Sequence, residues 1–345
     1  MSQGYTVAVV GATGAVGQKI MEKLIERSFP YSNLKLLASN RSAGKKIEVK
    51  GFTYTIEEAT PESFDGVDIA FFSAGGSISK TLAKEAVSRG AIVIDNTSAF
   101  RMDKDTPLVV PEVNKQALHE QKGIIANPNC STIQMVCALE PIRQQYGLSK
   151  VIVSTYQAVS GAGAAAINEL KTQSETISEN NPQPEILPVK SADKHYPIAG
   201  NVIPQIDIFG ENGFTLEEHK MMNETKKIMA LPELSIAATC VRVPVVTGHS
   251  ESVYIEVDQQ NVSVEDIKQL LSSSKGVTLQ DAPEHQQYPM PYFAEDQDDV
   301  FVGRVRKDPS NSKGFHMWIV SDNLLKGAAL NSIQIAEALI EEGIL

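Results

Sequence analysis

The sequence of 345 residues has little cysteine and no long apolar run. Its three cysteines, Cys130, Cys137 and Cys240, form an odd count without the spacing of a disulfide framework or a zinc site, so we expect no bound metal. No segment approaches the roughly 18 apolar residues that a membrane helix needs. The chain opens in a strand, without a basic and apolar leader, so a reducing cytoplasm is the expected location.

Positive charge is also in short supply. Lys and Arg number 31 against 42 Asp and Glu, which gives a formal net charge of −11. This balance argues against nucleic acid or an anionic membrane as the main partner, although a local basic pocket can still bind a small acidic substrate. There is no internal repeat and no low-complexity segment. The length predicts two domains, and 42% hydrophobic residues suffice for a core in each.

The first half of the chain alternates apolar strands with amphipathic helices, which predicts a doubly wound parallel sheet. The expected strands are residues 5–10, 34–38, 67–73, 91–96 and 123–126, and the expected helices are 17–26, 79–89 and 130–146.

The second half has a different, α+β character. Strands are expected at 151–160, 237–246 and 252–258, and helices at 161–180, 217–229, 264–273 and 323–342. Residues 181–215 carry five prolines and predict a long irregular excursion, of the kind that serves a function or an interface.

The glycine-rich turn GATGAVG follows the first strand. Gly11, Gly14 and Gly17 are spaced so that the turn is tight, phosphate can approach the backbone, and the helix packs close to the strand. Free N–H groups at the following helix start favour phosphate. A purely structural glycine turn is the alternative, but the position in a doubly wound domain favours dinucleotide binding.

The end of the second expected strand distinguishes NAD from NADP. An NAD site would carry Asp or Glu there, whereas this chain has Ser39, Arg41 and Ser42, with Lys45 and Lys46 beyond. A solvated basic loop would look the same. The missing carboxylate favours NADP.

Cys130 falls where a helix begins, after a strand and Pro128. The helix macrodipole and unpaired N–H groups at that position favour the thiolate form. The alternative is a buried core cysteine, which is how we interpret Cys137 and Cys240. Of six histidines, His249 stands out because it is expected on a Thr-Gly turn between two strands, so it is the candidate base.

Several motifs together resemble the aspartate-β-semialdehyde dehydrogenase family over nearly the whole chain. They are GATGAVG at 11–17, SAGG at 73–76, DNTSAFR at 95–101, NPNCS at 127–131, YQAVSGAG at 156–163, EEHK at 217–220 and RVPVVTGHSE at 242–251.

The resemblance implies an NADPH-dependent reduction of L-aspartyl-4-phosphate to L-aspartate-4-semialdehyde with release of phosphate. This reaction belongs to lysine (through diaminopimelate), threonine and methionine biosynthesis. A cysteine thioester would form at Cys130 and accept hydride, with proton transfer at His249, while Gln157 orients the substrate. The N–H groups at the start of the 130–146 helix are candidate oxyanion donors.

The resemblance also implies the binding residues. Substrate would contact Arg101, Asn129, Gln157, Glu217, Lys220 and Arg242, with Arg101 and Lys220 on phosphate, Arg242 on the α-carboxylate and Glu217 on the amino group. NADP would contact Gly11, Thr13, Gly14, Ala15 and Val16 in the turn, Ser39, Arg41 and Ser42 after it, and Ser160, Gly161 and Asn323 in the second half. Glu217 and Lys220 lie three residues apart on one helix, so an intrahelical ion pair is the alternative for them.

We therefore predict a Rossmann-type NADP-binding domain over 1–129, a catalytic and dimerisation domain with a mixed sheet over 130–322, and a C-terminal helix over 323–345 that returns to the first domain. A homodimer is expected. The nearest rival enzyme is N-acetyl-γ-glutamyl-phosphate reductase, whose acetylated substrate would give Glu217 no purpose. A rival of another class is an NADP-sensing regulator with a redox-reactive thiol.

Overall fold

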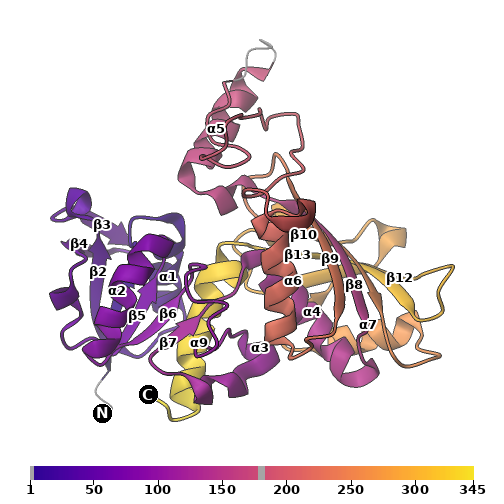
Figure 1. Cartoon of the computed structure of the whole chain (residues 1–345), viewed down its shortest axis with the longest axis horizontal. Coiled ribbons are helices and arrows are strands. Elements are labelled where there is room, and N and C mark those ends of the chain that lie inside the picture. The colour runs from indigo at the N-terminus through magenta and orange to yellow at the C-terminus, as the bar shows by residue number, and fades with distance from the viewer. Residues whose placement is uncertain (1–3, 178–182) are drawn as a thin grey trace. The chain divides into compact units, whose positions relative to one another are not determined.

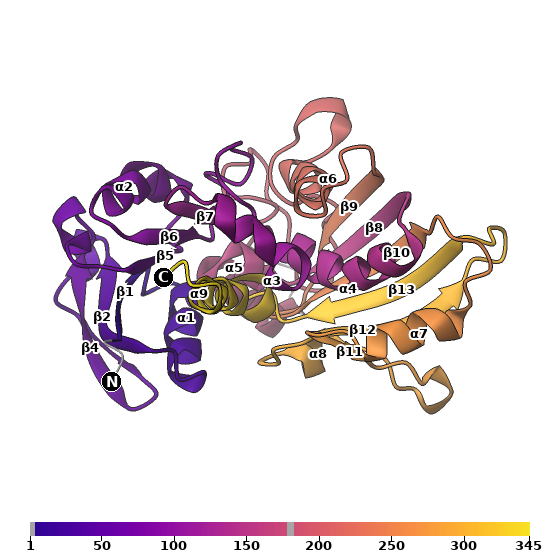
Figure 2. The same cartoon turned by 90° about the horizontal axis from the view of Figure 1, so that it is seen from below.

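The computed structural model describes residues 4–177 and 183–345, which form two compact units (Figures 1 and 2). The first unit contains the chain up to Asn129 together with Ala328–Leu345, and the second runs from Cys130 to Gly327. The C-terminal segment thus belongs to the first unit, as expected, although it joins that unit at Ala328 rather than at residue 323.

The first unit is built on a seven-stranded sheet of order β3-β4-β2-β1-β5-β6-β7, parallel except for the β3–β4 pair. Its elements are β1 (Tyr5–Val10), α1 (Ala15–Glu26), β2 (Tyr31–Ala38), β3 (Lys46–Val49), β4 (Phe52–Glu58), β5 (Ile69–Phe72), α2 (Gly76–Ser88), β6 (Ile92–Asp95), α3 (Pro111–Asn114), β7 (Ile124–Ala126) and α9 (Leu330–Glu341).

Helices cover both faces of this sheet because the strands are apolar on both. Val7 and Val9 of β1 pack in one core with residues of α1 and α9, whereas Ala8 and Val10 pack in another with residues of α2. Successive side chains of a strand point to opposite faces, so a continuous apolar run supplies both cores. The predicted doubly wound fold is confirmed.

The second unit is built on a six-stranded mixed sheet of order β11-β12-β13-β10-β8-β9. The β8–β9 and β11–β12 pairs are parallel and the others are antiparallel. Its elements are α4 (Cys130–Tyr146), β8 (Lys150–Gln157), α5 (Ala164–Glu175), α6 (Leu216–Ile228), β9 (Ser235–Arg242), β10 (His249–Glu256), α7 (Val264–Ser272), β11 (Val277–Leu279), α8 (Pro291–Ala294), β12 (Val300–Lys307) and β13 (Gly314–Ser321).

Three helices, α4, α6 and α7, pack against this second sheet and against one another. Figure 2 shows α4 running alongside β13, and Figure 1 shows α5 projecting away from the sheet. Alternate residues of β8 are buried, from Val151 to Gln157, and the residues between them are more exposed. The buried face therefore carries both core residues and the polar side chains considered below.

Several strands were missing from the sequence prediction. β3 and β4 extend the first sheet, and β11, β12 and β13 form the far half of the second. β12 and β13 alternate apolar and polar residues, in VFVGRVRK and GFHMWIVS, which is the signal of a half-buried strand.

Two predicted helices are shorter than expected. The helix expected over 323–342 begins only at Leu330, because a π-helical turn, Leu325–Ala329, precedes it. In place of a helix over 161–180, the 3₁₀ turn Val159–Ala162 and Gly163, at φ 91°, come before α5. Residues 178–182, which include Pro182 of the expected excursion, lie outside the described residues.

Gly327, the last residue of the second unit, packs directly against Cys130, the first residue of that unit. A Cβ atom added to Gly327 would lie 2.8 Å from Cβ of Cys130 and 3.3 Å from its Cα. Carbon atoms do not approach so closely, so only glycine fits at this position while Cys130 stays where it is. Cys130 can thus occupy the start of α4 only because residue 327 has no side chain.

Replacing Gly327→Ala is therefore expected to destabilise the protein by about 1–3 kcal/mol, because α4 or the π-helical turn must shift to make room. Thermal unfolding should show a lower midpoint, and iodoacetamide should alkylate Cys130 more slowly because the new methyl group lies on its Cβ. Gly76→Ala is the matched control, since its Cβ would meet nothing closer than 4.0 Å. A Gly327→Ala protein with the control's midpoint and alkylation rate would contradict this packing.

Candidate active site

Cys130 is the first residue of α4, as predicted, and its side chain is only partly exposed. Cys137 and Cys240 are buried, which confirms the interpretation of both as core residues. Burial raises the pKa of the Cys240 thiol far above its usual range. Among the three thiols, the one at a helix start is therefore the one accessible for chemistry.

A row of side chains crosses the buried face of the second sheet at one end of its strands. His249 of β10 is paired in register with Ser321 of β13, and Gln157 of β8 with Arg242 of β9. The β10–β8 register continues to place His249 beside Gln157, and their Nε2 atoms lie 3.5 Å apart. We call Ser321, His249, Gln157 and Arg242 the first row.

His249 is fully buried, and the other five histidines are partly or wholly exposed. It is the first residue of β10, not part of the turn expected between the strands. Its Nδ1 accepts a hydrogen bond of 3.0 Å from the main-chain N–H of Ala158. The neutral imidazole therefore carries its proton on Nε2. Burial and the charge of Arg242 lower the pKa of His249 to about 3, against a smaller opposing effect of Glu217.

Arg242 is a buried cation that pairs directly with no carboxylate among the described residues. Its Nη1 donates to the main-chain oxygen of Ala158 at 2.6 Å, and its Nε has no partner among the described residues. Burial lowers the pKa of Arg242, while Glu217 and Cys130 oppose that change. A Cβ on Gly161 would lie 3.1 Å from Nη1 of Arg242 and 3.4 Å from the His249 ring. These groups thus converge on one spot.

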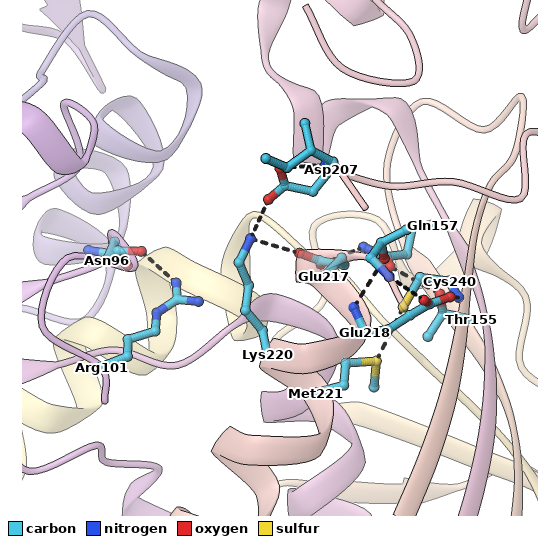
Figure 3. Close-up of polar contacts among 12 residues, drawn as sticks. Asn96, Arg101, Thr155, Gln157, Asp207, Glu217, Glu218, Lys220, Met221 and Cys240 are labelled. Carbon is cyan, nitrogen blue, oxygen red and sulfur yellow. Dashed lines mark hydrogen bonds and ion pairs between the residues drawn. The ribbon is translucent and has the colours of Figure 1, made fainter. Parts of the chain in front are cut away.

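A chain of hydrogen bonds leads outward from the first row (Figure 3). Gln157 accepts from the hydroxyl of Thr155 at 3.0 Å and donates to Oε1 of Glu217 at 3.2 Å. Oε2 of Glu217 accepts from Nζ of Lys220 at 3.2 Å, so the alternative of an intrahelical ion pair is confirmed. Lys220 also pairs with Asp207 at 2.9 Å. Burial alone would lower the pKa of Lys220, but these two carboxylates raise it.

Arg101 and Asn129 belong to the first unit. The guanidinium of Arg101 is buried and donates to the main-chain oxygens of Asn127 at 2.9 Å and Asn96 at 2.8 Å, the latter drawn in Figure 3. Arg101 thus ties together the loops that follow β6 and β7. Asn129 is also buried and directly precedes Cys130 in the chain.

The glycine-rich turn has the geometry that a dinucleotide requires. Gly11 adopts φ 90°, and a Cβ on it would lie 2.9 Å from the backbone of Ser73 and Ala74. A Cβ on Gly17 would lie 2.3 Å from the Gly11 oxygen. α1 begins at Ala15, followed by Val16, with no side-chain cap and no acidic residue in its first turn. Thr13 and Gly14 are exposed, and the Gly14 N–H donates to the Gly11 oxygen at 2.9 Å. The first N–H groups of a helix lack intrahelical partners, so the start of α1 fits a phosphate.

The segment after β2 contains the side chains that were predicted to contact the 2′-phosphate of NADP. Ser39 and Arg41 are exposed and Ser42 is half-buried, in and around the 3₁₀ turn Asn40–Ser42. β4, which was not predicted, brings Glu58 beside this turn, where it accepts a hydrogen bond of 2.9 Å from Asn40. This carboxylate could not be found from the sequence without β4.

Ser160 and Asn323 are both buried in the second unit and bind each other. Nδ2 of Asn323 lies 2.9 Å from Oγ of Ser160, and Oδ1 of Asn323 accepts from the N–H of Gly248 at 2.8 Å. Asn323 thereby fixes the turn that leads into His249. Gly161 follows Ser160 and lies over the first row, as described above.

Sequence reasoning missed Ala158, Thr155 and Asp207, whose contacts depend on strand register and on the fold of the 183–215 segment. The described residues include no group of three or more His, Cys, Asp or Glu side chains that could hold a metal ion. Among the same residues, no helix combines the length and apolar character needed to cross a membrane.

Comparisons with known proteins agree with this architecture. The family described as "Semialdehyde dehydrogenase, NAD binding domain" matches residues 6–121, and "Semialdehyde dehydrogenase, dimerisation domain" matches residues 139–326. The aspartate-semialdehyde dehydrogenase of Bacillus subtilis (strain 168) is 65% identical over 340 residues, which cover 98% of each chain.

Two solved structures extend the comparison. Aspartate semialdehyde dehydrogenase II of Vibrio cholerae, complexed with ASA, is 46% identical with a TM-score of 0.91 and covers 99% of both chains. The Candida albicans enzyme with NADP is 28% identical with a TM-score of 0.76, over 99% of this chain and 100% of that one. With full-length relatives at such identity, the chain belongs to the aspartate-semialdehyde dehydrogenase family.

Proposed function

We propose that this chain reduces L-aspartyl-4-phosphate to L-aspartate-4-semialdehyde with NADPH and releases phosphate, through a thioester on Cys130. The reaction serves lysine, threonine and methionine biosynthesis. One observation carries the proposal. A helix-start cysteine opens the same unit whose sheet places a neutral imidazole and a buried guanidinium on either side of Gln157, which donates to the buried carboxylate of Glu217 on α6.

The charges of the site match an amino-acid substrate. Arg242 is buried and lacks a carboxylate partner among the described residues, so the α-carboxylate of the substrate completes it as a bidentate pair. Glu217 receives the α-ammonium group. Lys220 and Arg101 bind phosphate, with Lys220 exchanging its pairs with Glu217 and Asp207 for the substrate anion. Asn129 and Gln157 contribute hydrogen bonds.

The rival enzyme N-acetyl-γ-glutamyl-phosphate reductase is not supported. Its substrate nitrogen is acylated and uncharged, whereas this site presents the carboxylate of Glu217 beside Gln157. The full-length relative at 65% identity is also an aspartate-semialdehyde dehydrogenase. A regulator that senses NADP without catalysing a reaction is not supported either, because it would have no use for the side chains of the first row.

The thiolate of Cys130 attacks the acyl carbon, a C–S bond forms, and the C–O bond to phosphate breaks. When bound, NADPH supplies the hydride that reduces the resulting thioester. The C–S bond then breaks, the thiolate is regained and the aldehyde leaves. Two easier steps thus replace one difficult displacement. The main-chain N–H groups at the start of α4 stabilise the tetrahedral oxyanion.

His249 is the general acid/base of the scheme. Because Nδ1 accepts from Ala158, Nε2 is the ring nitrogen that can form a hydrogen bond with the substrate oxygen. Burial, and after it the charge of Arg242, hold the pKa of His249 down before substrate arrives. An α-carboxylate on Arg242 offsets that charge, so substrate binding raises the pKa of His249 toward the range that proton transfer requires.

The first unit binds NADP through Gly11, Thr13, Gly14, Ala15 and Val16, with Ser39, Arg41 and Ser42 at the 2′-phosphate. Ser160, Gly161 and Asn323 of the second unit complete the cofactor site. The open, uncapped start of α1 supports this assignment because it offers donors to the pyrophosphate.

We propose that the protein forms a homodimer through its second unit. Residues 1–129 form the cofactor domain and residues 130–322 form the catalytic and dimerisation domain. The proposed location is the cytoplasm. The outer face of the second sheet supports the dimer, because Ile152 and Tyr156 of β8 are exposed there and Tyr156 packs on Trp318. The three cysteines are thiols and not disulfides, which suits a reducing compartment.

Replacing Cys130→Ala is expected to lower phosphate-dependent NADP reduction with L-aspartate semialdehyde by at least a thousandfold, because no thioester can form. The dissociation constant of NADP should change less than about twofold, which fluorescence titration measures. Cys137→Ala, seven residues along the same helix and buried, is the control and should keep turnover. Turnover by Cys130→Ala at the control's rate would exclude the thioester route.

Replacing Arg242→Lys should raise KM for L-aspartate semialdehyde at least tenfold, since a point charge cannot grip a carboxylate with two parallel hydrogen bonds. Steady-state kinetics at saturating phosphate measures this, and KM for NADP should stay within about twofold. Arg306→Lys, on the partly exposed β12, provides the control. An unchanged KM in Arg242→Lys would remove the carboxylate role.

The pKa of His249 predicts a pH dependence of stability. The folded chain keeps the imidazole neutral down to about pH 3, whereas the unfolded chain protonates it near 6.5. Between these values the unfolded state binds more protons, so this group makes the fold less stable as pH falls. His249→Gln should therefore gain thermal stability relative to wild type between pH 7.5 and 5. His285→Gln, at an exposed position, should follow wild type, and parallel curves for all three proteins would contradict the assignment.

A further inference from the structure

Glu251 is a buried carboxyl group that the proposed reaction does not use. It lies in β10, two residues after His249, and is fully buried. Neither carboxyl oxygen has a hydrogen-bond partner among the described residues. Buried polar groups are nearly always paired, so an acid kept at this position calls for an explanation.

Strand register places Glu251 directly behind the first row. Residues i and i+2 of a strand share a face, so Glu251 points to the same side of the sheet as His249. Its cross-strand neighbours are Thr155 of β8 and Ile319 of β13. Thr155 in turn donates to Gln157 of the first row. Glu251 therefore stands in a second row that supports the first.

Gln134 connects the first row to the nucleophile's helix. It is buried on α4, one turn after Cys130, so both residues lie on the same side of that helix. Its Nε2 donates to the main-chain oxygen of His249 at 3.3 Å, and its Oε1 accepts from Oγ of Ser321 at 2.8 Å. One amide side chain thus joins the start of β10 and the end of β13 to α4.

The chemistry of Glu251 suits contact with this amide. Gln134 binds the main chain of His249, two residues before Glu251 on the same strand face, so its amide lies next to the Glu251 carboxyl group. Burial raises the pKa of Glu251 well above its usual range, and Gln134 opposes the rise. A neutral carboxylic acid has both a donor and an acceptor, as does an amide. Its carbonyl oxygen can accept from the second N–H of Gln134, and its O–H can donate to the hydroxyl oxygen of Thr155.

We propose that Glu251 is a positioning residue for the reaction: through Gln134 it holds the main chain of His249 against α4, and so fixes the imidazole relative to Cys130. The proposal rests on the acid/base role of His249 proposed above. A leucine at 251 would fill the space, but it would leave Gln134 free to turn and loosen its hold on the His249 peptide.

A double-mutant cycle in the full-length protein tests this inference. Glu251→Leu should lower kcat about tenfold or more, with KM for L-aspartate semialdehyde and for NADP within about twofold. Gln134→Leu should cause a similar loss. The double variant should be no slower than Gln134→Leu alone, because Glu251 acts through that amide. Glu251→Gln, which keeps the shape and a donor, should restore most of the kcat lost in Glu251→Leu.

Val253→Ala is the matched control for core damage, since Val253 lies two residues further along the same face of β10 and is equally buried. It should lower the thermal midpoint while kcat stays within about twofold of wild type. Additive losses in the cycle, a wild-type kcat in Glu251→Leu, or a tenfold loss in Val253→Ala would each overturn the proposal.

The same assays separate this proposal from the proposed function. If His249→Gln loses turnover while Glu251→Leu keeps it, the positioning role alone fails. If His249→Gln turns over like wild type, the acid/base role fails and the positioning role falls with it.

Discussion

The guanidinium of Arg242, buried without a carboxylate partner in the part of the chain that the structure describes, is the constraint around which the second unit is organised. Arg242 is almost fully removed from water, and burying a charge is costly unless it is paired. The fold lessens that cost through the main-chain oxygen of Ala158 and the nearby charge of Glu217, yet Nε stays unpaired among the described residues. A site that keeps this charge is arranged to receive an anion, and on our assignment the substrate supplies it.

The pairing register of the strands, and not the loops, brings the side chains of the first row together. Residues from four neighbouring strands reach one row only because each strand presents alternate residues inward. A slip of one residue in β10 would place Ser250 in the first row instead of His249 and turn the imidazole to the other face of the sheet. Polar contacts between the strands and α4, above all those of Gln134, oppose such a slip. The second row and α4 therefore act together with the hydrophobic core to hold the strands in one register.

Sequence reasoning found the groups whose position depends on local signals. The glycine turn, the helix start at Cys130 and the parallel sheet of the first unit follow from spacing and periodicity over a few residues. The family motifs added Gln157 and Arg242. What could not be predicted depends on pairing between distant segments: β12 and β13, the carboxylate of Asp207 beside Lys220, and the main-chain donor to His249. Each of these requires the register of a strand or the path of an excursion, which no local pattern encodes.

The two buried charges near the imidazole couple substrate binding to chemistry. Arg242 opposes protonation of His249 and Glu217 favours it, and burial adds to the effect of Arg242. On the proposed assignment, the substrate's carboxylate offsets Arg242 while its ammonium group offsets Glu217. Since Arg242 has the larger effect of the two, their joint neutralisation raises the pKa of the imidazole. A ligand with only the ammonium group would lower it instead. On the proposed assignment, the complete amino-acid end therefore favours protonation of His249 more than the ammonium group alone would, which couples recognition of the substrate to proton transfer.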